Sequence, residues 1–405
     1  MSLWLKMGFR NLFRHKRRSL FTGLSIVTGF ALCSFFIGWA EGSYNQIIDG
    51  FTRYRTGHIQ IHARGYVDDP SFYKTFDLTP GRAGILDADP HILGWSPRIT
   101  TGALFASDSA SSGGELKAFD PGREAETTQF QRHIVKGRIF KKGAQEVVLG
   151  KELAGVLKVS PGDHIVVVTQ AADGITASGR YRVSGLSDTG EKSVDRVTAV
   201  IPLSQGKELL WMGERIHEIA VTVDRMKSVE AVKQRLKREL ADSGLDIQSW
   251  QEFNPEFYRA MMADKRGNYI LLLIMVIIVA VGVFNTVLMA VMERQHEYGL
   301  MRALGTSPGG VFALVVSETG CLVAMASFTG MLLGMGLNWY FHVHGLTLPQ
   351  PLSYGGITFE SLHSEIVLKS VVLPWATVLV SAFTVTLYPA IQAARVAPAR
   401  VMRSF

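Results

Sequence analysis

The chain has few cysteines and few charged residues. Only two cysteines occur, Cys33 and Cys321, and each lies inside an apolar run, so no disulfide framework is expected. Charged residues make up 19% of the 405 residues, below the usual quarter found in soluble domains. This shortage weighs against an ordinary soluble protein and directs attention to the places where apolar residues gather.

The sequence also lacks the common signatures of catalysis. Gly206-Lys207 has neither the upstream glycine nor the following Ser or Thr of a phosphate-binding loop, so no ATP site is predicted in this chain. No Gly-x-Ser-x-Gly elbow and no His-Glu-x-x-His helix is present. His342 and His344 have no acidic or cysteine neighbour, which is typical of structural or solvated histidines. We therefore predict no catalytic residues, no metal site and no cofactor in the chain itself.

Four long uncharged segments hold many of the apolar residues. Each is long enough to cross a bilayer, which needs roughly 20 apolar residues. Buried core helices of a large soluble protein are the alternative, but four segments of this length and purity disfavour it. The segments are residues 20–39, 269–292, 319–341 and 370–394.

Basic residues flank the first and last of these segments. Six of them precede residue 19, and Arg395, Arg400 and Arg403 follow the fourth segment, whereas the loop 342–369 has only Lys369 as a strong base. The positive-inside rule predicts that both termini are cytoplasmic and that 41–268 lies on the other side. These flanks face anionic lipid and account for much of the net charge of +7, so no nucleic-acid partner is expected. A cleaved signal peptide is the alternative, but the first apolar run is long for one, and the leader resembles an amphipathic interfacial helix.

The segment between the first two spans has mixed α and β character. Alternating Val- and Ile-rich stretches predict strands, and apolar spacing predicts helices at 151–157, 203–212 and 228–240. The polar stretch 106–114 is predicted to be an exposed loop. A helix at 256–264 runs into the second span and would form a stalk. The predicted strands are 58–62, 146–149, 164–169, 181–186, 197–201 and 218–223.

A charged amphipathic stretch, 293–310, follows the second span and ends in glycine and proline. Its charged residues are predicted to contact a soluble partner, and its apolar residues to fill a groove on that partner. A solvated connector at the lipid headgroups is the alternative. Two polar residues lie in or beside the spans: Asn285, which would hydrogen-bond a neighbouring helix, and Glu318, either solvated or paired with a base. The candidate coupling residues are Glu293, Arg294, Glu297, Tyr298, Met301, Arg302, Leu304 and Gly305.

Four motifs together resemble FtsX/MacB-type ABC transporter permeases. The stretch 293–305, ERQHEYGLMRALG, is similar to the cytoplasmic signature of that family, and Glu318 stands where the family commonly has Glu. Residues 388–399, YPAIQAARVAPA, resemble its closing motif. In the outer segment, 146–154 (EVVLGKELA) with Gly162-Asp163 is similar to a further family pattern, and the basic opening 10–18 also fits.

The resemblance implies an α-helical membrane protein with four transmembrane helices and a large α+β periplasmic domain of the MacB-like core type. It implies two copies of an ABC ATPase that binds ATP and Mg²⁺, a second permease chain that is identical or paralogous, and contact with membrane lipid. Because the first span lies so near the start of the sequence, the ATPase is expected on a separate polypeptide.

The length and the stretch 56–61 look most like the lipoprotein-releasing, Lol-type branch. Members of that branch extract lipoproteins from the inner membrane toward a periplasmic carrier. The alternatives are efflux of a peptide, antibiotic or lipid, and FtsX-like regulation of a cell-wall hydrolase.

The expected boundaries follow from the spans and flanks. They are an interfacial helix at 1–18, transmembrane helices at 19–40, 269–292, 311–341 and 370–394, a periplasmic domain with its stalk at 41–268, a coupling helix at 293–310, a periplasmic loop at 342–369 and a cytoplasmic tail at 395–405.

Overall fold

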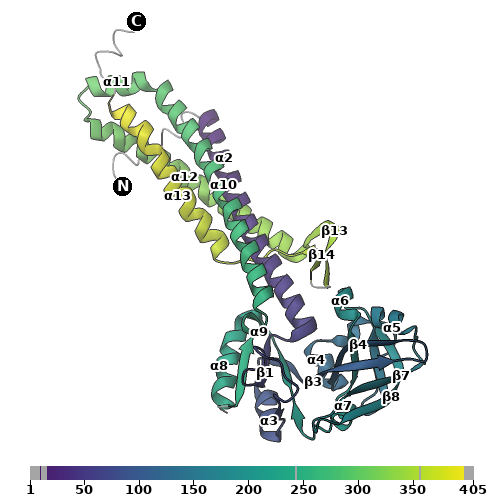
Figure 1. Ribbon diagram of the computed structural model, residues 1–405. Coiled ribbons are helices and arrows are strands. Elements are labelled where there is room, and N and C mark those ends of the chain that lie inside the picture. Colours follow the sequence, from purple (N-terminus) through teal and green to yellow (C-terminus); the bar gives the residue numbers. More distant parts are fainter. Residues whose placement is uncertain (1–9, 11–15, 242–243, 355–356, 396–405) are drawn as a thin grey trace. The chain divides into compact units, whose positions relative to one another are not determined.

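A computed structural model describes residues 10, 16–241, 244–354 and 357–395 (Figure 1). Most of the predicted interfacial helix at 1–18 and of the tail at 395–405, with part of the closing motif, therefore lies outside the described residues. The chain divides into two compact units. The helical unit comprises Met1–Tyr44, Met262–Leu348 and Ser361–Phe405, and the α+β unit comprises Asn45–Met261 and Pro349–Glu360.

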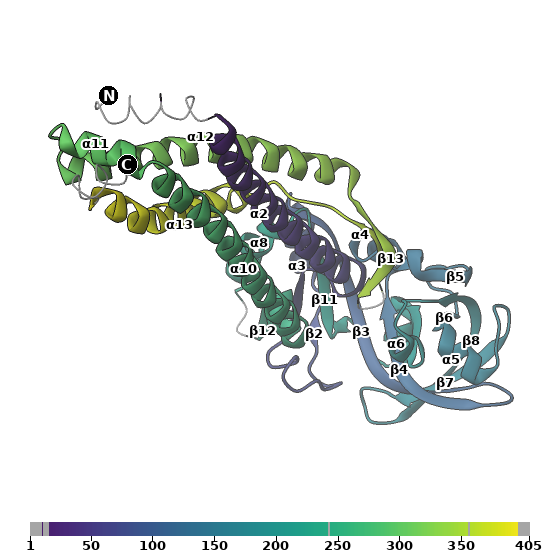
Figure 2. The same cartoon turned by 90° about the horizontal axis from the view of Figure 1, so that it is seen from above.

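Four long helices form the helical unit, and Figures 1 and 2 show them running beside one another. All four are long and apolar enough to cross a membrane, which confirms the four predicted spans. Each helix contributes to one apolar cluster, for example through Phe30, Val283, Val323 and Val378. The helices are α2 (Lys16–Phe51), α10 (Pro255–Glu293), α12 (Pro308–His344) and α13 (Lys369–Ala394).

A buried polar cluster joins α2 to the end of α12 and to the segment before α13. Asn338 is fully buried; its Nδ2 donates to the Ser34 carbonyl at 3.1 Å, and its Oδ1 accepts from the Ser364 hydroxyl at 2.6 Å. The Glu365 amide donates to the Gly38 carbonyl at 2.9 Å. Because a buried amide is costly unless it is hydrogen-bonded, these contacts stabilise one arrangement of the three segments.

Gly42→Ala is expected to destabilise the helical unit by about 1–3 kcal/mol, the usual range for overpacking. A Cβ at Gly42 would lie 2.7 Å from the Glu365 nitrogen and closer still to the His363 carbonyl oxygen, and backbone atoms cannot rotate away. Thermal unfolding of the purified protein in detergent measures the loss. Gly320→Ala in α12 is the control. Apart from its chain neighbours and the nearby backbone of its own helix, no described atom lies within 4 Å of a Cβ at Gly320. An equal shift in both variants would contradict the steric explanation.

The α+β unit is built on a ten-stranded mixed sheet, in which β4 pairs with β9 and β6 with β8 in parallel and the other pairs are antiparallel. The order is β12-β1-β11-β3-β4-β9-β6-β8-β5, and β7 pairs with β3 and β8. The strands are β1 (Ile59–Ala63), β3 (Ile92–Ala106), β4 (Ser111–Phe119), β5 (Ile134–Gly137), β6 (Glu146–Gly150), β7 (His164–Gln170), β8 (Thr176–Ser187), β9 (Thr198–Pro202), β11 (Glu218–Val223) and β12 (Leu245–Ser249).

The six strands predicted in this part of the chain are confirmed, as are the helices α5 (Lys151–Leu157), α7 (Leu203–Leu209) and α8 (Val229–Glu239). Short elements complete the described structure. They are η1 (Thr52–Thr56), α3 (Pro80–Ala88), α4 (Pro121–Thr127), η2 (Phe130–His133), α6 (Lys192–Asp195), η3 (Met226–Ser228), α9 (Trp250–Phe253), the strand pair β2 (Phe76–Asp77) and β10 (Arg215–Ile216), and the hairpin β13 (Leu346–Tyr354) and β14 (Ile357–Leu362).

The exposed loop predicted at 106–114 is shorter than expected and comprises only residues 107–110, since β3 ends at Ala106 and β4 begins at Ser111. The residues Ser111 to Gly114 begin β4, which forms one long hairpin with β3 (Figure 2). At Gly114 the backbone lies close to the residue that precedes β9: a Cβ there would lie 3.0 Å from the Val197 carbonyl carbon. Close approach therefore accounts for Gly114, whereas a Cβ at Gly113 would meet no atom within 4 Å.

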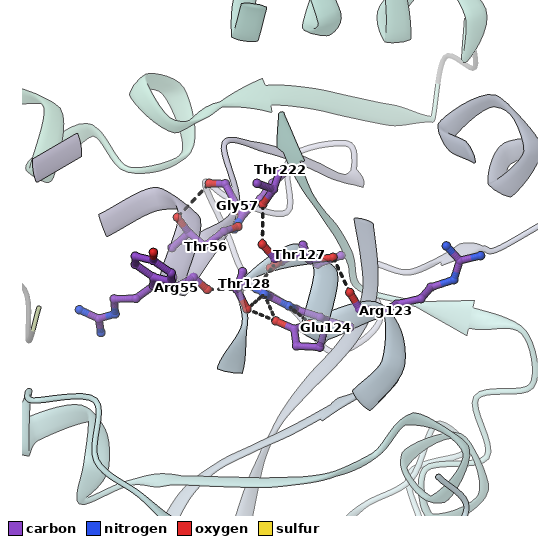
Figure 3. A network of polar contacts seen from close by, with 12 residues as sticks. Arg55, Thr56, Gly57, Arg123, Glu124, Thr127, Thr128 and Thr222 are labelled. Atoms are coloured by element: carbon purple, nitrogen blue, oxygen red, sulfur yellow. Dashed lines mark hydrogen bonds and ion pairs between the residues drawn. The ribbon is translucent and has the colours of Figure 1, made fainter. Parts of the chain in front are cut away.

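A buried polar network connects η1, α4 and β11 inside the α+β unit (Figure 3). The Thr222 hydroxyl donates to the Thr127 carbonyl at 2.9 Å, and the Thr127 hydroxyl donates to the Arg123 carbonyl at 2.8 Å. The Thr128 hydroxyl donates to the Glu124 carboxylate, which is 1% exposed. Arg98 links this network to η1, because its guanidinium donates both to Glu124 and, at 3.4 Å, to the Arg55 carbonyl.

Candidate coupling site around helix α11

Helix α11 (Gln295–Ala303) lies between the second and third long helices of the helical unit. Glu297 in its first turn and Arg302 in its last turn both favour the helix dipole. Gly305, with φ 95°, provides the left-handed residue that lets the chain turn after the helix. Ser307 then caps α12 by accepting a hydrogen bond from the Gly310 amide at 3.1 Å, with Pro308 at the first helical position.

A buried ion pair anchors the start of α11. Nη1 of Arg294 donates to both carboxylate oxygens of Glu318 on α12, at 2.7 and 3.0 Å, and its Nε donates to Glu297 at 2.8 Å. The Arg294 and Glu318 side chains are 8% and 11% exposed. Of the two alternatives for Glu318, pairing with a base is therefore the one observed. Such a pair fixes the α10–α11 junction against α12, because separating two buried charges is strongly unfavourable.

Tyr298 fixes the middle of α11 to the same part of the unit. Its side chain is 2% exposed and packs in an apolar cluster contributed by α10, α12 and α13. Met301 packs partly against this cluster. Tyr298 and Arg294 therefore lie inside this chain rather than on the surface where a partner would bind. The other cluster members are Val291, Val311, Leu314, Val315, Ala390 and Ala393.

The exposed face of α11 carries both charged and apolar residues. Leu300 is 56% exposed and Leu304 80% exposed, while Glu293, His296 and Glu297 are also on the surface. Leu300 and His296 are absent from the residues predicted for the site. Their spacing was a usable signal, since positions 296, 300 and 304 fall on one face of a helix. Arg302 is half-buried and donates to the Thr306 carbonyl at 3.4 Å.

Asn285 lies on an exposed side of α10, and none of the described residues hydrogen-bonds its side chain. The hydrogen bond predicted for it is thus not made within the described part of this chain. His342 and His344 contact backbone carbonyls instead of each other: their Nδ1 atoms lie 2.8 Å from Ser364 O and 3.0 Å from Tyr340 O. Among the described residues, no group of three or more His, Cys, Asp or Glu is arranged to hold a metal ion.

The chain has four helices long enough to span a membrane, an α+β segment between the first two and a short anchored helix between the second and third, and the comparisons below assign this arrangement to the ABC transporter permeases. A family model described as the MacB-like periplasmic core domain matches residues 19–239, and one described as the FtsX-like permease C-terminal matches residues 269–398. The first match covers more than half of the chain, which therefore belongs to the family of permeases with a MacB-like periplasmic core domain.

Relatives found by sequence agree with this assignment, and the predicted resemblance is confirmed. The lipoprotein-releasing system transmembrane protein LolC of Neisseria meningitidis is 24% identical over 99% of both chains. LolE of Haemophilus influenzae is 22% identical over 95% of this chain and 91% of its own. The macrolide export protein MacB of Pasteurella multocida is 23% identical over 83% of this chain and 52% of its own. The periplasmic region of MacB from Actinobacillus actinomycetemcomitans aligns with a TM-score of 0.38 at 16% identity, covering 53% of this chain and 97% of that structure.

Proposed function

We propose that this chain is a permease subunit of an ABC transporter that releases lipoproteins from the inner membrane. The match to LolC over 99% of both chains and the match to LolE support this substrate class. In this proposal two copies of a separate ATPase bind ATP and Mg²⁺, and this chain supplies no catalytic residue. A second permease chain, identical or paralogous, completes the membrane part, and a periplasmic carrier receives the lipoprotein. Both termini are cytoplasmic, as the basic flanks predict.

The observation that carries the proposal is the combination of an anchored and an exposed face on α11. Arg294 and Tyr298 fix the helix to α10, α12 and α13, while Leu300 and Leu304 remain available to a groove on another protein. Helix-in-groove recognition uses apolar anchors at this spacing. A push on the exposed face would be passed to the long helices because the inner face is held by a buried ion pair and a packed aromatic ring.

A groove between α2 and α10 supports an acyl-chain substrate. It has a volume of about 520 Å³ within the helical unit and is lined mostly by apolar side chains, among them Leu24, Leu32, Met275 and Ile278. Apolar walls of this kind bind hydrocarbon without leaving polar groups unpaired. The lipid anchor of a lipoprotein has the matching chemistry.

Leu300→Asp/Leu304→Asp is expected to reduce lipoprotein release at least tenfold. Two apolar anchors would become charged and would no longer fit an apolar groove on the ATPase. Release from proteoliposomes containing the ATPase measures this, and co-purification of the ATPase measures the contact itself. Val135→Asp in β5, also an exposed apolar residue at 58% exposure, is the control and should release normally. Full release and full ATPase binding by the double variant would refute the coupling role of α11.

Export of a small apolar compound is the second candidate, because macrolide exporters are among the relatives. The same proteoliposomes distinguish the two functions. A permease for lipoproteins transfers a triacylated protein to the soluble fraction and leaves a macrolide unmoved, whereas an exporter does the reverse.

A further inference from the structure

A cavity of about 340 Å³ opens in the α+β unit where the turn between β7 and β8 meets α7. Its volume is at the lower end of the range found for small-molecule sites, roughly 300–1,000 Å³. Nothing in the proposed transport function uses it. Its polar lining consists of amides, hydroxyls and carboxylates, from Gln145, Asp173, Thr176, Ser178, Tyr181, Gln205 and Glu208.

Trp211 at this cavity has a backbone conformation that its residue type disfavours. Its φ is 54°, in the left-handed region, and it follows the end of α7, where the Met212 amide donates to the Lys207 carbonyl at 3.0 Å. Glycine is the usual residue at this position of a helix end, because a Cβ is strained there by roughly 1–2 kcal/mol. The helix end alone therefore gives no reason for tryptophan.

The Trp211 side chain is also exposed where its neighbours are buried. It is 62% exposed, whereas Leu210 and Met212 are 1% and 2% exposed. A large aromatic side chain stabilises the fold most when it is buried, so an exposed tryptophan contributes little of that stabilisation. Two unfavourable features at one residue on the wall of a cavity are typical of a functional site, where strain is retained for the sake of binding.

The chemistry of the wall indicates a neutral, hydroxylated ligand. None of the described lining residues is basic, so a phosphate or carboxylate ligand would have no cationic partner there. Amides and hydroxyls both donate and accept, and a flat indole offers an apolar face. A sugar ring has the complementary surface, with C–H groups on its face and hydroxyls around its rim.

A cationic ligand would use this wall poorly. A cation would interact with Trp211 and the two carboxylates, but the amides and hydroxyls of the wall would make no hydrogen bonds to it. One of those carboxylates, Glu208, already accepts from Gln205 at 3.2 Å, and the other, Asp173, accepts from the Ile175 amide at 3.0 Å. We propose that the α+β unit binds a saccharide in this cavity, with Trp211 as its stacking platform.

Trp211→Gly separates binding from folding. The full-length protein in detergent is titrated calorimetrically with chitotetraose, cellotetraose and maltotetraose. Wild type is expected to bind at least one of them, and Trp211→Gly to bind it at least tenfold more weakly, as for the loss of an aromatic hot spot. The unfolding temperature of the variant should be equal to or above that of wild type, because glycine favours the left-handed helix end.

Lys158→Gly is the matched control. Lys158 also has φ 55° and ends a helix, α5, through a hydrogen bond to the Ala154 or Gly155 carbonyl, but it does not line the cavity. Its glycine variant should keep the full saccharide affinity. Unchanged affinity in Trp211→Gly, or no binding of any of the three sugars by wild type, would overturn the proposal. Binding of a trilysine peptide that Glu208→Gln abolishes, without sugar binding, would also overturn it and assign the cavity to cations.

Discussion

Arg294→Ala is expected to destabilise the helical unit by about 3–5 kcal/mol, the usual loss when one partner of a buried ion pair is removed. The Glu318 side chain, which is 11% exposed in the wild type, would lose both of its contacts to Arg294. The cost of burying its carboxylate would then no longer be offset by the arginine charge, and uptake of a proton or entry of water into the packed junction would relieve that cost. Either response loosens α11 from α12, so transport should fall together with stability.

A double-mutant cycle tests the pair rather than the single residue. Arg294→Ala, Glu318→Ala and the double variant are compared by thermal unfolding of the purified protein in detergent. The double variant should be more stable than the sum of the two single losses predicts, because it removes both buried charges of the pair together. Arg302→Ala is the control; this half-buried side chain makes one long contact to the Thr306 carbonyl, so a loss below about 1.5 kcal/mol is expected. Strict additivity of the two single variants would show that the pair contributes nothing.

The same ion pair shows how far the sequence could lead at this site. The helix itself was predictable, since 293–310 combines amphipathic spacing with a glycine stop, and α11 lies within that range. The inward direction of Arg294 was not predictable, because its partner Glu318 is 24 residues away on another helix. The sequence likewise predicted that Tyr298 contacts a partner, but residues of α10, α12 and α13 cover its side chain. Spacing along one helix identifies a face, but only tertiary packing decides which face is buried.

In the α+β unit, alternation found the strands in which Val and Ile point inward, such as β11. It missed β4, because the first residues of that strand are Ser and Gly, which carry no hydrophobic signal. The apolar spans were the easiest part to predict, since bilayer insertion selects long uncharged runs whatever the fold outside. Trp211 had no signal at all, because its significance depends on φ and exposure together.

Arg98→Ala is expected to have the largest effect within the α+β unit, at least about 3–5 kcal/mol. Arg98 on β3 lies between two carboxylates, with Nη2 2.5 Å from Glu124 and Nη1 3.1 Å from Glu218. Glu124 is 1% exposed, and its other partner, Thr128, belongs to the network in Figure 3. Removing the guanidinium takes away the ion-pair partner that the two poorly solvated acids share, although His62 stays 3.5 Å from Glu218.

The pH dependence of that loss separates charge from packing. Burial opposes ionisation of Glu218, but the His62 hydrogen bond and the Arg98 charge outweigh it and lower the pKa of Glu218 from 4.5 to about 2. A lowered pKa in the folded state stabilises the fold above pH 4.5, and this contribution is lost as the pH falls toward 2. In Arg98→Ala, the arginine charge no longer opposes the effect of burial, so the pKa of Glu218 is expected to rise. The cost of burying the charged carboxylate disappears once Glu218 is protonated. The stability difference between wild type and variant should therefore shrink as the pH is lowered through this range.

Urea-induced unfolding of the full-length protein between pH 7 and pH 3 measures this difference. Arg98→Lys should be intermediate, because lysine keeps the charge but cannot bridge two carboxylates with a planar fork. Arg138→Ala is the surface control: Arg138 pairs with Glu146 at 2.5 Å but is 48% exposed, and exposed pairs contribute little. A stability difference for Arg98→Ala that does not change with pH would mean that Arg98 acts through its volume and hydrogen bonds. A difference that disappears in acid would mean that this interior is held together by charge, which is unusual for the core of a sheet and would make the α+β unit far more sensitive to acid than its apolar strands suggest.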